Sequence, residues 1–134
     1  MTYRELLDEA IRARDDSYSP YSGIAVGAAL LCEDGTVYRG ANIENAAFTP
    51  TVCAERVAFF KAISDGQRAF SAIAIVGAKH GEAPVSSFPP CGVCRQVMAE
   101  FCSPDFTVVL SEGGELRCFK LSELLPEGFG PSNI

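Results

Sequence analysis

Two patterns of apolar residues alternate along the chain and predict its secondary structure. Between Tyr3 and Asp16 apolar residues recur at helical spacing with charged residues opposite, which predicts an amphipathic helix. From Ile24 to Cys32 every residue is small, apolar or β-branched, which predicts a buried strand. The Asp34-Gly35 pair is a strong turn signal, so we expect Thr36 to Asn42 to return as the second strand of a hairpin.

The rest of the pattern predicts an α/β domain. It indicates, in order, a loop at Glu44–Val52, a helix at Cys53–Ser64, a strand at Ser71–Ala78, a loop at Lys79–Pro89, a helix at Cys91–Phe101, strands at Thr107–Ser111 and Leu116–Lys120, and a short helix at Ser122–Leu125. Strands that are apolar throughout need cover on both faces, which predicts three layers with the sheet in the middle. We expect each of the two middle helices to join neighbouring parallel strands by a right-handed crossover. No repeat or linker divides the chain, so residues 1–134 are expected to form a single domain.

Charge and composition narrow the classes of partner. The chain carries 11 basic and 17 acidic side chains, a formal net charge of −6, and a surface of that sign repels the phosphate backbone of nucleic acids. A small nucleoside, whose recognition is local, remains compatible with this charge. No apolar run approaches the roughly 20 residues that a membrane helix needs, and the first residues lack the apolar core of a signal peptide. We therefore expect a cytoplasmic protein with no nucleic-acid or membrane partner.

The spacing of three cysteines indicates a metal site. In the reducing cytoplasm cysteines stay as thiols, so they need not form disulfides. Cys53, Cys91 and Cys94 have a spacing that favours zinc. Three protein ligands leave one coordination position open for water, which is typical of catalytic rather than structural zinc sites. Both halves of the motif fall at predicted helix starts, where the helix dipole favours thiolates. The sequence thus predicts one zinc ion per chain.

Two residues beside the first cysteine are candidates for chemistry. Glu55 need not bind the metal, and a carboxylate next to an activated water molecule can take up a proton and pass it on. Alone, a glutamate at a helix start would only complement the helix dipole. Zinc with three thiolates is negatively charged, so a group that draws electron density from sulfur is needed, and Arg56 is the natural candidate.

The remaining cysteines and the single histidine have simpler interpretations. Cys32, Cys102 and Cys118 lie in or beside apolar runs and are expected to be buried as small apolar side chains. His80 lies in a polar loop, where histidines are usually solvated. If one of these four residues completed the coordination, the site would be a structural zinc module with no use for Glu55. That alternative stays open at the level of sequence.

Six motifs taken together resemble the small homotetrameric cytidine deaminases. They are Tyr18–Ser22, Val26–Leu30, Asn42–Ala47, Cys53–Arg56, Pro90–Gln96 and Glu123–Pro126. The resemblance covers nearly the whole chain, and it includes the Cys-x-Glu and Pro-Cys-x-x-Cys parts of a zinc deaminase signature. It implies a five-stranded mixed sheet packed between helices. It also implies zinc-dependent hydrolysis of cytidine and 2′-deoxycytidine to the uridines with release of ammonia, a reaction of pyrimidine salvage.

The same resemblance implies roles in substrate binding. Asn42 and Glu44 would hold the sugar hydroxyls, although turn chemistry at a strand end is an alternative for both. The Ala54 N–H would hold the base carbonyl O2, and the backbone around Pro90 and Cys91 would accept from the exocyclic amine. In this family neighbouring subunits complete the site, and the residues implied to reach across are Ala46, Phe48 and Phe129. Local packing is the alternative for the two phenylalanines.

The chain also departs from the family pattern at the pocket. Ile24 stands where members usually place a phenylalanine that lines the nucleoside pocket, and Phe48 stands where tyrosine is common. Loss of an aromatic face would weaken packing on the substrate by ~0.5–1.5 kcal/mol without touching the metal or the proton transfer. An antibiotic nucleoside of the blasticidin type therefore remains an alternative substrate. Deaminases of nucleic acids usually carry histidine at the position of Cys53 and a basic groove, and this chain has neither.

Overall fold

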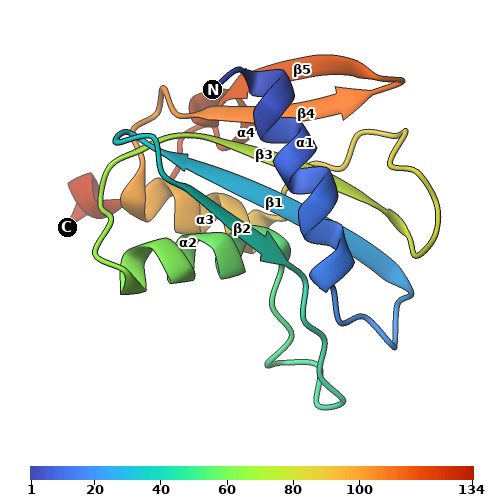
Figure 1. Ribbon diagram of the computed structural model, residues 1–134. Helices are drawn as coiled ribbons and strands as arrows, with labels where there is room; N and C mark the ends of the chain where they lie inside the picture. The colour runs from blue at the N-terminus through green and yellow to red at the C-terminus, as the bar shows by residue number, and fades with distance from the viewer.

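Five strands form one mixed sheet with helices on both of its faces (Figure 1). In this computed structural model, which describes residues 1–134, the strands are β1 (Ile24–Cys32), β2 (Val37–Ala41), β3 (Phe70–Lys79), β4 (Thr107–Glu112) and β5 (Glu115–Lys120). The helices are α1 (Tyr3–Ala13), α2 (Ala54–Ser64), α3 (Gly92–Phe101) and α4 (Leu121–Leu124). Every helix and strand predicted from the sequence is present. The first helix tightens into a 3-10 turn at Arg14–Asp16, and a second such turn lies at Pro131–Asn133.

The strand order differs from the sequence-based expectation at one crossover. Across the sheet the order is β2-β1-β3-β4-β5, and only β3 and β4 are parallel neighbours. The α3 crossover therefore joins neighbouring parallel strands, as predicted. The prediction for α2 is wrong, because β1 lies between β2 and β3, the two strands that α2 connects. Strand β1 is almost wholly buried, which fits its place inside the sheet with an antiparallel partner on each side.

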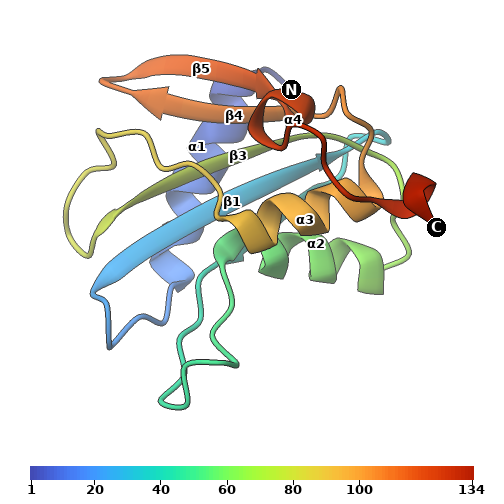
Figure 2. The same ribbon diagram turned by 180° about the vertical axis from the view of Figure 1, so that it is seen from behind.

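The two faces of the sheet are covered by different helices, which confirms the three predicted layers. Helix α1 packs on one face, and α2 and α3 pack side by side on the other (Figures 1 and 2). On the α1 face, Leu6 and Leu7 pack against small strand residues such as Ala29. The opposite face holds the larger apolar cluster, in which Phe59 of α2 and Met98 of α3 are fully buried. None of the helices is long and apolar enough to cross a lipid bilayer.

Close packing fixes the starts of α2 and α3 against the sheet. A Cβ atom at Gly40 of β2 would lie 2.2 Å from the Ala54 carbonyl oxygen, so the first turn of α2 rests directly on the β2 backbone. The loop before α3 is held by Arg95, whose Nε donates to the Pro90 carbonyl at 2.8 Å. Nη1 of the same guanidinium donates to the Leu124 carbonyl at 2.6 Å, which ties the loop to α4. These contacts set the relative position of the two helix starts.

The cysteines outside the predicted metal motif differ in exposure. Cys32 is buried in the core, as expected, and Cys102 is half-buried. The expectation for Cys118 is wrong, since this residue is exposed. Cys118 lies on β5, an edge strand with no buried residue, so an apolar run in the sequence did not mean burial there.

Candidate metal centre and substrate pocket

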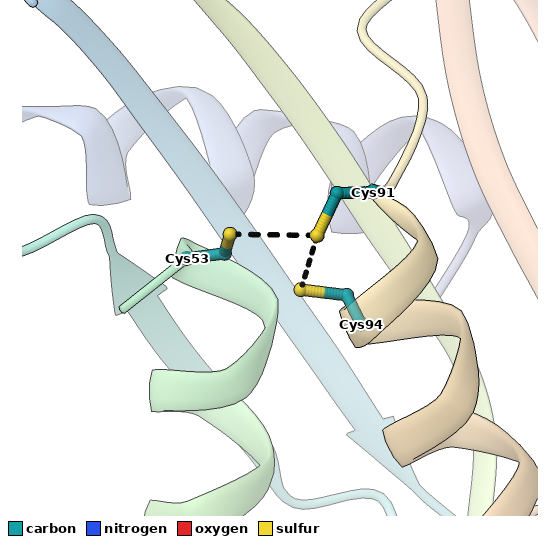
Figure 3. Close-up of side chains that lie close together, drawn as sticks. All are labelled: Cys53, Cys91 and Cys94. Carbon is teal, nitrogen blue, oxygen red and sulfur yellow. Dashed lines mark hydrogen bonds between the residues drawn. The ribbon is translucent and has the colours of Figure 1, made fainter. Parts of the chain in front are cut away.

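Three cysteine sulfurs gather where α2 and α3 begin (Figure 3). Cys53 immediately precedes α2, Cys91 immediately precedes α3, and Cys94 lies in the first turn of α3. The Sγ atoms of Cys53 and Cys91 are 3.7 Å apart, and those of Cys91 and Cys94 are 3.5 Å apart. Sulfurs bound to one tetrahedral zinc at ~2.3 Å lie about 3.8 Å from one another. The three side chains therefore fit a shared zinc ion.

No fourth protein donor joins this set. The cluster of potential metal ligands consists of the three cysteines, with all their sulfurs within 4.8 Å of one another. His80 instead shares a hydrogen bond with Ser19, at 2.5 Å between Nε2 and Oγ. The alternative of a closed, structural zinc site therefore lacks the ligand that it requires.

The environment of the sulfurs favours negative charge. Hydrogen bonds from the Cys94 thiol and then from Arg56 lower the pKa of Cys53 to about 5, although burial opposes this shift. Nη2 of Arg56 lies 3.5 Å from the Cys53 sulfur. The side chains of Cys53 and Cys91 do not cap their helices, so the first-turn N–H groups also contribute positive potential. One thiolate is thus stabilised at neutral pH before any metal binds.

Glu55 is the buried acid of the site. It lies in the first turn of α2 and is only 3% exposed. Burial, followed by the nearby charge of Cys53, raises the pKa of Glu55 to about 7, while other contacts lower it less. A carboxyl group with a pKa near neutrality can both accept and return a proton under physiological conditions.

A cavity of about 400 Å³ opens beside the cysteines. Its volume lies within the range of pockets that bind small molecules. The sequence-predicted site residues along its walls are Ile24, Asn42, Glu44, Cys53, Ala54, Glu55 and Cys91. The other residues of the walls are Ser22, Val26, Thr51, Val52, Phe88 and Pro89. The structure thus brings the candidate acid, two of the metal ligands and the candidate sugar-binding pair into one space.

Phe88 is a pocket residue that sequence reasoning missed. It comes from the loop between β3 and α3, and it supplies the only aromatic ring in the pocket wall. A Cβ atom at Gly77 of β3 would lie 2.7 Å from this ring, so the ring lies directly over the strand backbone. The available signals were a glycine inside a strand and a single phenylalanine in an otherwise polar loop. Phe88 thus provides an aromatic face in a pocket where Ile24 does not.

Asn42 is held rigidly by the protein. This side chain is 8% exposed, and its Oδ1 accepts from the Val26 N–H at 2.9 Å and from Ser17 Oγ at 2.6 Å. Its Nδ2 donates to the Ile24 carbonyl at 2.9 Å. These contacts fix which way the amide points and leave one N–H of Nδ2 free for a ligand.

Glu44 is held as a carboxylate. Its Oε1 accepts from the N–H groups of Tyr21 and Ser22, each at 3.0 Å. Its Oε2 accepts from the Ser22 hydroxyl at 2.5 Å. The Ser22 hydroxyl is the main cause that holds the pKa of Glu44 below its ordinary value. Glu44 therefore offers its remaining lone pair to a ligand as an acceptor.

The residues implied to act across subunits do not join the pocket within one chain. Ala46 is exposed on the loop after β2. Phe48 is 67% exposed, has a φ of +62° and makes an edge-to-face contact with Tyr21 at 5.7 Å between ring centres. Phe129 is 60% exposed near the C-terminus. All three are free to contact another molecule.

The start of α2 offers a backbone donor to a ligand, and the loop before α3 offers backbone acceptors. Ala54 is fully buried and lines the pocket, and its N–H is the first of α2, so no helical carbonyl accepts from it. The Pro90 carbonyl, in contrast, already accepts from Arg95 and is not part of the pocket wall. Within the predicted acceptor region, Cys91 and the adjacent Pro89 are the residues that reach the cavity.

Comparison with known proteins extends the likeness beyond the cysteine motif. A family model described as the cytidine and deoxycytidylate deaminase zinc-binding region matches residues 1–110. The cytidine deaminase of Sporosarcina psychrophila is 49% identical over 135 residues, covering 100% of this chain and 96% of the relative. The cytidine deaminase of Halalkalibacterium halodurans is 52% identical to this chain, and the match covers 96% of this chain and 95% of the relative. The crystal structure of cytidine deaminase from Burkholderia pseudomallei matches with a TM-score of 0.88 at 44% identity, over 96% of this chain and 100% of that one.

Proposed function

The chain belongs to the cytidine and deoxycytidylate deaminase family, and from this premise we propose that it converts cytidine and 2′-deoxycytidine to the corresponding uridines with release of ammonia. One observation carries the proposal. Three sulfurs at zinc-binding distances adjoin the buried Glu55 in a pocket of about 400 Å³ that also holds Asn42 and Glu44. We take residues 1–134 to act as one deaminase domain in pyrimidine salvage.

The chemistry divides between the metal and Glu55. Zinc bound by Cys53, Cys91 and Cys94 would lower the pKa of a water molecule toward ~7 and so supply a nucleophile for C4 of the base. Glu55 takes the proton that this water loses, delivers it to ring N3 and later carries a proton to the departing amine. The C4–N bond then breaks, ammonia leaves and a carbonyl remains at C4. Burial supports this role because it raises the pKa of Glu55 to about 7.

Arg56 supports the same chemistry through its contact with the sulfur of Cys53. Its Nη2 donates to Cys53 Sγ at 3.5 Å and draws negative charge away from the sulfur. Three thiolates would otherwise leave the zinc a weak Lewis acid. Groups that contact metal ligands in this way commonly change metal affinity or activity by ~10–100-fold.

The pocket walls suggest how a nucleoside is oriented. The free N–H of Ala54 would donate to the base carbonyl O2, close to the metal ligands. The free N–H of Asn42 would donate to a sugar hydroxyl, and the Glu44 carboxylate would accept from it. The ring of Phe88 would contact the flat face of the base.

We further propose a homotetramer in which Ala46, Phe48 and Phe129 reach into neighbouring sites. The support is that all three residues are exposed, and that Phe48 and Phe129, 67% and 60% exposed, belong to the aromatic residues that are enriched in subunit interfaces. Light scattering on the purified protein should give about four times the chain mass of 14.3 kDa. A stable monomer with full activity would contradict shared sites.

We also propose that the protein works in the cytoplasm without nucleic-acid or membrane partners. Metal binding requires Cys53, Cys91 and Cys94 to stay reduced, and the cytoplasm maintains thiols in that state. The net charge of −6 disfavours association with polynucleotides.

Ammonia release tests the proposed function. The zinc-loaded protein is incubated separately with cytidine, 2′-deoxycytidine, cytosine, a cytosine-containing oligonucleotide and a blasticidin-type antibiotic. We expect turnover of the first two, whereas turnover of the antibiotic alone would favour the alternative substrate. Glu55→Gln should keep its zinc, measured by metal analysis, and lose ~10²–10⁴-fold in kcat. Full activity of that variant would exclude the proton-transfer role.

A further inference from the structure

A chain of hydrogen bonds connects the only histidine to the sugar-binding amide. His80 Nε2 lies 2.5 Å from Ser19 Oγ, and Ser19 Oγ lies 3.0 Å from Ser17 Oγ. Ser17 Oγ in turn lies 2.6 Å from Asn42 Oδ1. We propose that His80 is a positioning residue that acts through Ser19 and Ser17 to fix Asn42 for recognition of a sugar hydroxyl. This inference rests on the proposed function, because it assigns the sugar to Asn42.

The direction of this chain is determined from its buried end. The Val26 N–H donates to Asn42 Oδ1, and Nδ2 donates to the Ile24 carbonyl, so the Oδ1 atom can only accept. The Ser17 hydroxyl must therefore donate its single hydrogen to Asn42. The Ser19 hydroxyl must then donate to Ser17, because Ser17 has no second hydrogen to offer.

The same reasoning fixes the role of the histidine. Ser19 is 4% exposed, and its one hydrogen is used toward Ser17. Its oxygen can meet the ring of His80 only as an acceptor, so Nε2 of His80 must carry a hydrogen. The backbone of His80 is anchored as well, since its N–H donates to the Gly23 carbonyl at 2.9 Å. His80 is therefore the terminal donor of a one-way series that ends at Asn42.

The consequence for the pocket is a strict division of roles. Both lone pairs of Asn42 Oδ1 are occupied, so the amide presents only an N–H donor to the ligand. Glu44 presents only an acceptor, because as a carboxylate it carries no hydrogen, and after the two hydrogen bonds to its Oε1 and the one to its Oε2 a lone pair of Oε2 remains for the ligand. A sugar hydroxyl satisfies this pair, since it can accept from Asn42 and donate to Glu44. A hydrogen atom or a phosphate at the same position cannot do both.

Hydrogen bonds in series polarise one another, so donation into Oδ1 makes the remaining Asn42 N–H a stronger donor. The influence of the histidine on the sugar-binding pair therefore runs through Asn42.

The experiment asks whether the series matters only when the sugar hydroxyl is present. His80→Leu and Ser19→Ala are compared with the unchanged protein, using 2′-deoxycytidine as substrate and 2′-deoxyuridine and 2′,3′-dideoxyuridine as competing inhibitors. We expect the KM for deoxycytidine and the inhibition constant of deoxyuridine to rise roughly 3–10-fold. The kcat should stay within about twofold, and the inhibition constant of the dideoxy compound should not change, because that compound lacks the 3′-hydroxyl.

Two further variants separate positioning from a general structural effect. His80→Gln retains a side-chain N–H near the position of Nε2 and should restore the lower KM. Ser71→Ala removes the hydroxyl of an exposed serine of β3 outside the series and should change nothing. His80 is exposed, so His80→Leu is expected to fold even if Ser19→Ala does not. Equal losses for the deoxy and dideoxy inhibitors, or no loss for either, would overturn the proposal. If the unchanged protein turned over neither nucleoside, the proposed function itself would fail and this inference with it.

Discussion

Phe88 should contribute to substrate affinity, because it is the one aromatic ring in the pocket wall. Phe88→Leu keeps an apolar side chain but removes the flat face that can pack on the base. We expect KM for 2′-deoxycytidine to rise roughly 2–10-fold, the equivalent of ~0.5–1.5 kcal/mol, with kcat little changed. Steady-state kinetics check this expectation. Phe88→Tyr retains the ring and serves as the matched control. If KM stayed the same in Phe88→Leu, the ring would form part of the pocket wall without contributing to substrate affinity.

Arg56 should tune the metal site through its contact with sulfur. Arg56→Gln removes the positive charge that lies 3.5 Å from the Cys53 sulfur. We expect zinc to dissociate faster or kcat to fall, by ~10–100-fold in either measure. Transfer of zinc to a chromogenic chelator follows the first quantity and ammonia release the second. Arg56→Lys keeps the charge without the planar group and should be intermediate. Unchanged values for both variants would show that the contact has no influence.

The residues that could be predicted from the sequence are those whose chemistry depends on short spacing. Cys53 and Glu55 are two apart, and Cys91 and Cys94 are three apart, so the local pattern alone indicated their common use. Phe88 could not be found in that way, because its position depends on contact with Gly77 in another element. His80 was predicted to be solvated, and it is exposed, yet its ring nitrogen meets the buried Ser19, 61 positions away in the chain.

At the scale of secondary-structure elements, the absence of a side chain at Gly40 should control where α2 begins. A Cβ atom there would lie 2.2 Å from the Ala54 carbonyl oxygen and 2.6 Å from the Ala58 nitrogen, both rigid backbone atoms. Gly40→Ala should therefore push the helix away, lower the free energy of unfolding by ~1–3 kcal/mol and weaken zinc binding. Thermal unfolding of the zinc-loaded protein and a zinc titration measure these effects.

Gly92 provides the comparison for that variant. It begins α3, and a Cβ atom there would have no neighbour within 4 Å. Gly92→Ala should leave the melting temperature unchanged or raise it, since alanine restricts the unfolded chain more than glycine does. If Gly40→Ala behaved in the same way, the close approach of α2 to β2 would not position the site.

The elements were more predictable than their arrangement. Strands β1 and β3 were recognised from their own apolar runs and β2 from the turn before it, and the α3 crossover follows from β3 and β4 being parallel neighbours. The place of β1 between β2 and β3 could not be inferred, because a strand that is apolar on both faces carries no pattern that names its partners. Pairing of that kind is decided by the sheet as a whole.

At the scale of the whole molecule, charge should separate nucleosides from nucleotides. The chain carries a net charge of −6, and the pocket wall contains two acidic side chains, the Glu44 carboxylate and Glu55, but no lysine, arginine or histidine. A 5′-phosphate would enter this field without a counter-charge, so kcat/KM for cytidine 5′-monophosphate should be at least ~10-fold below that for cytidine at low ionic strength. The difference in kcat/KM between the two compounds should become smaller as salt screens the repulsion, while kcat/KM for the neutral nucleoside stays constant. Rates of ammonia release at ~20 and ~200 mM salt measure both values of kcat/KM. Equal rates for the two compounds at low salt would mean that a cation from elsewhere reaches the phosphate, and the acidic pocket would then not determine the choice of substrate.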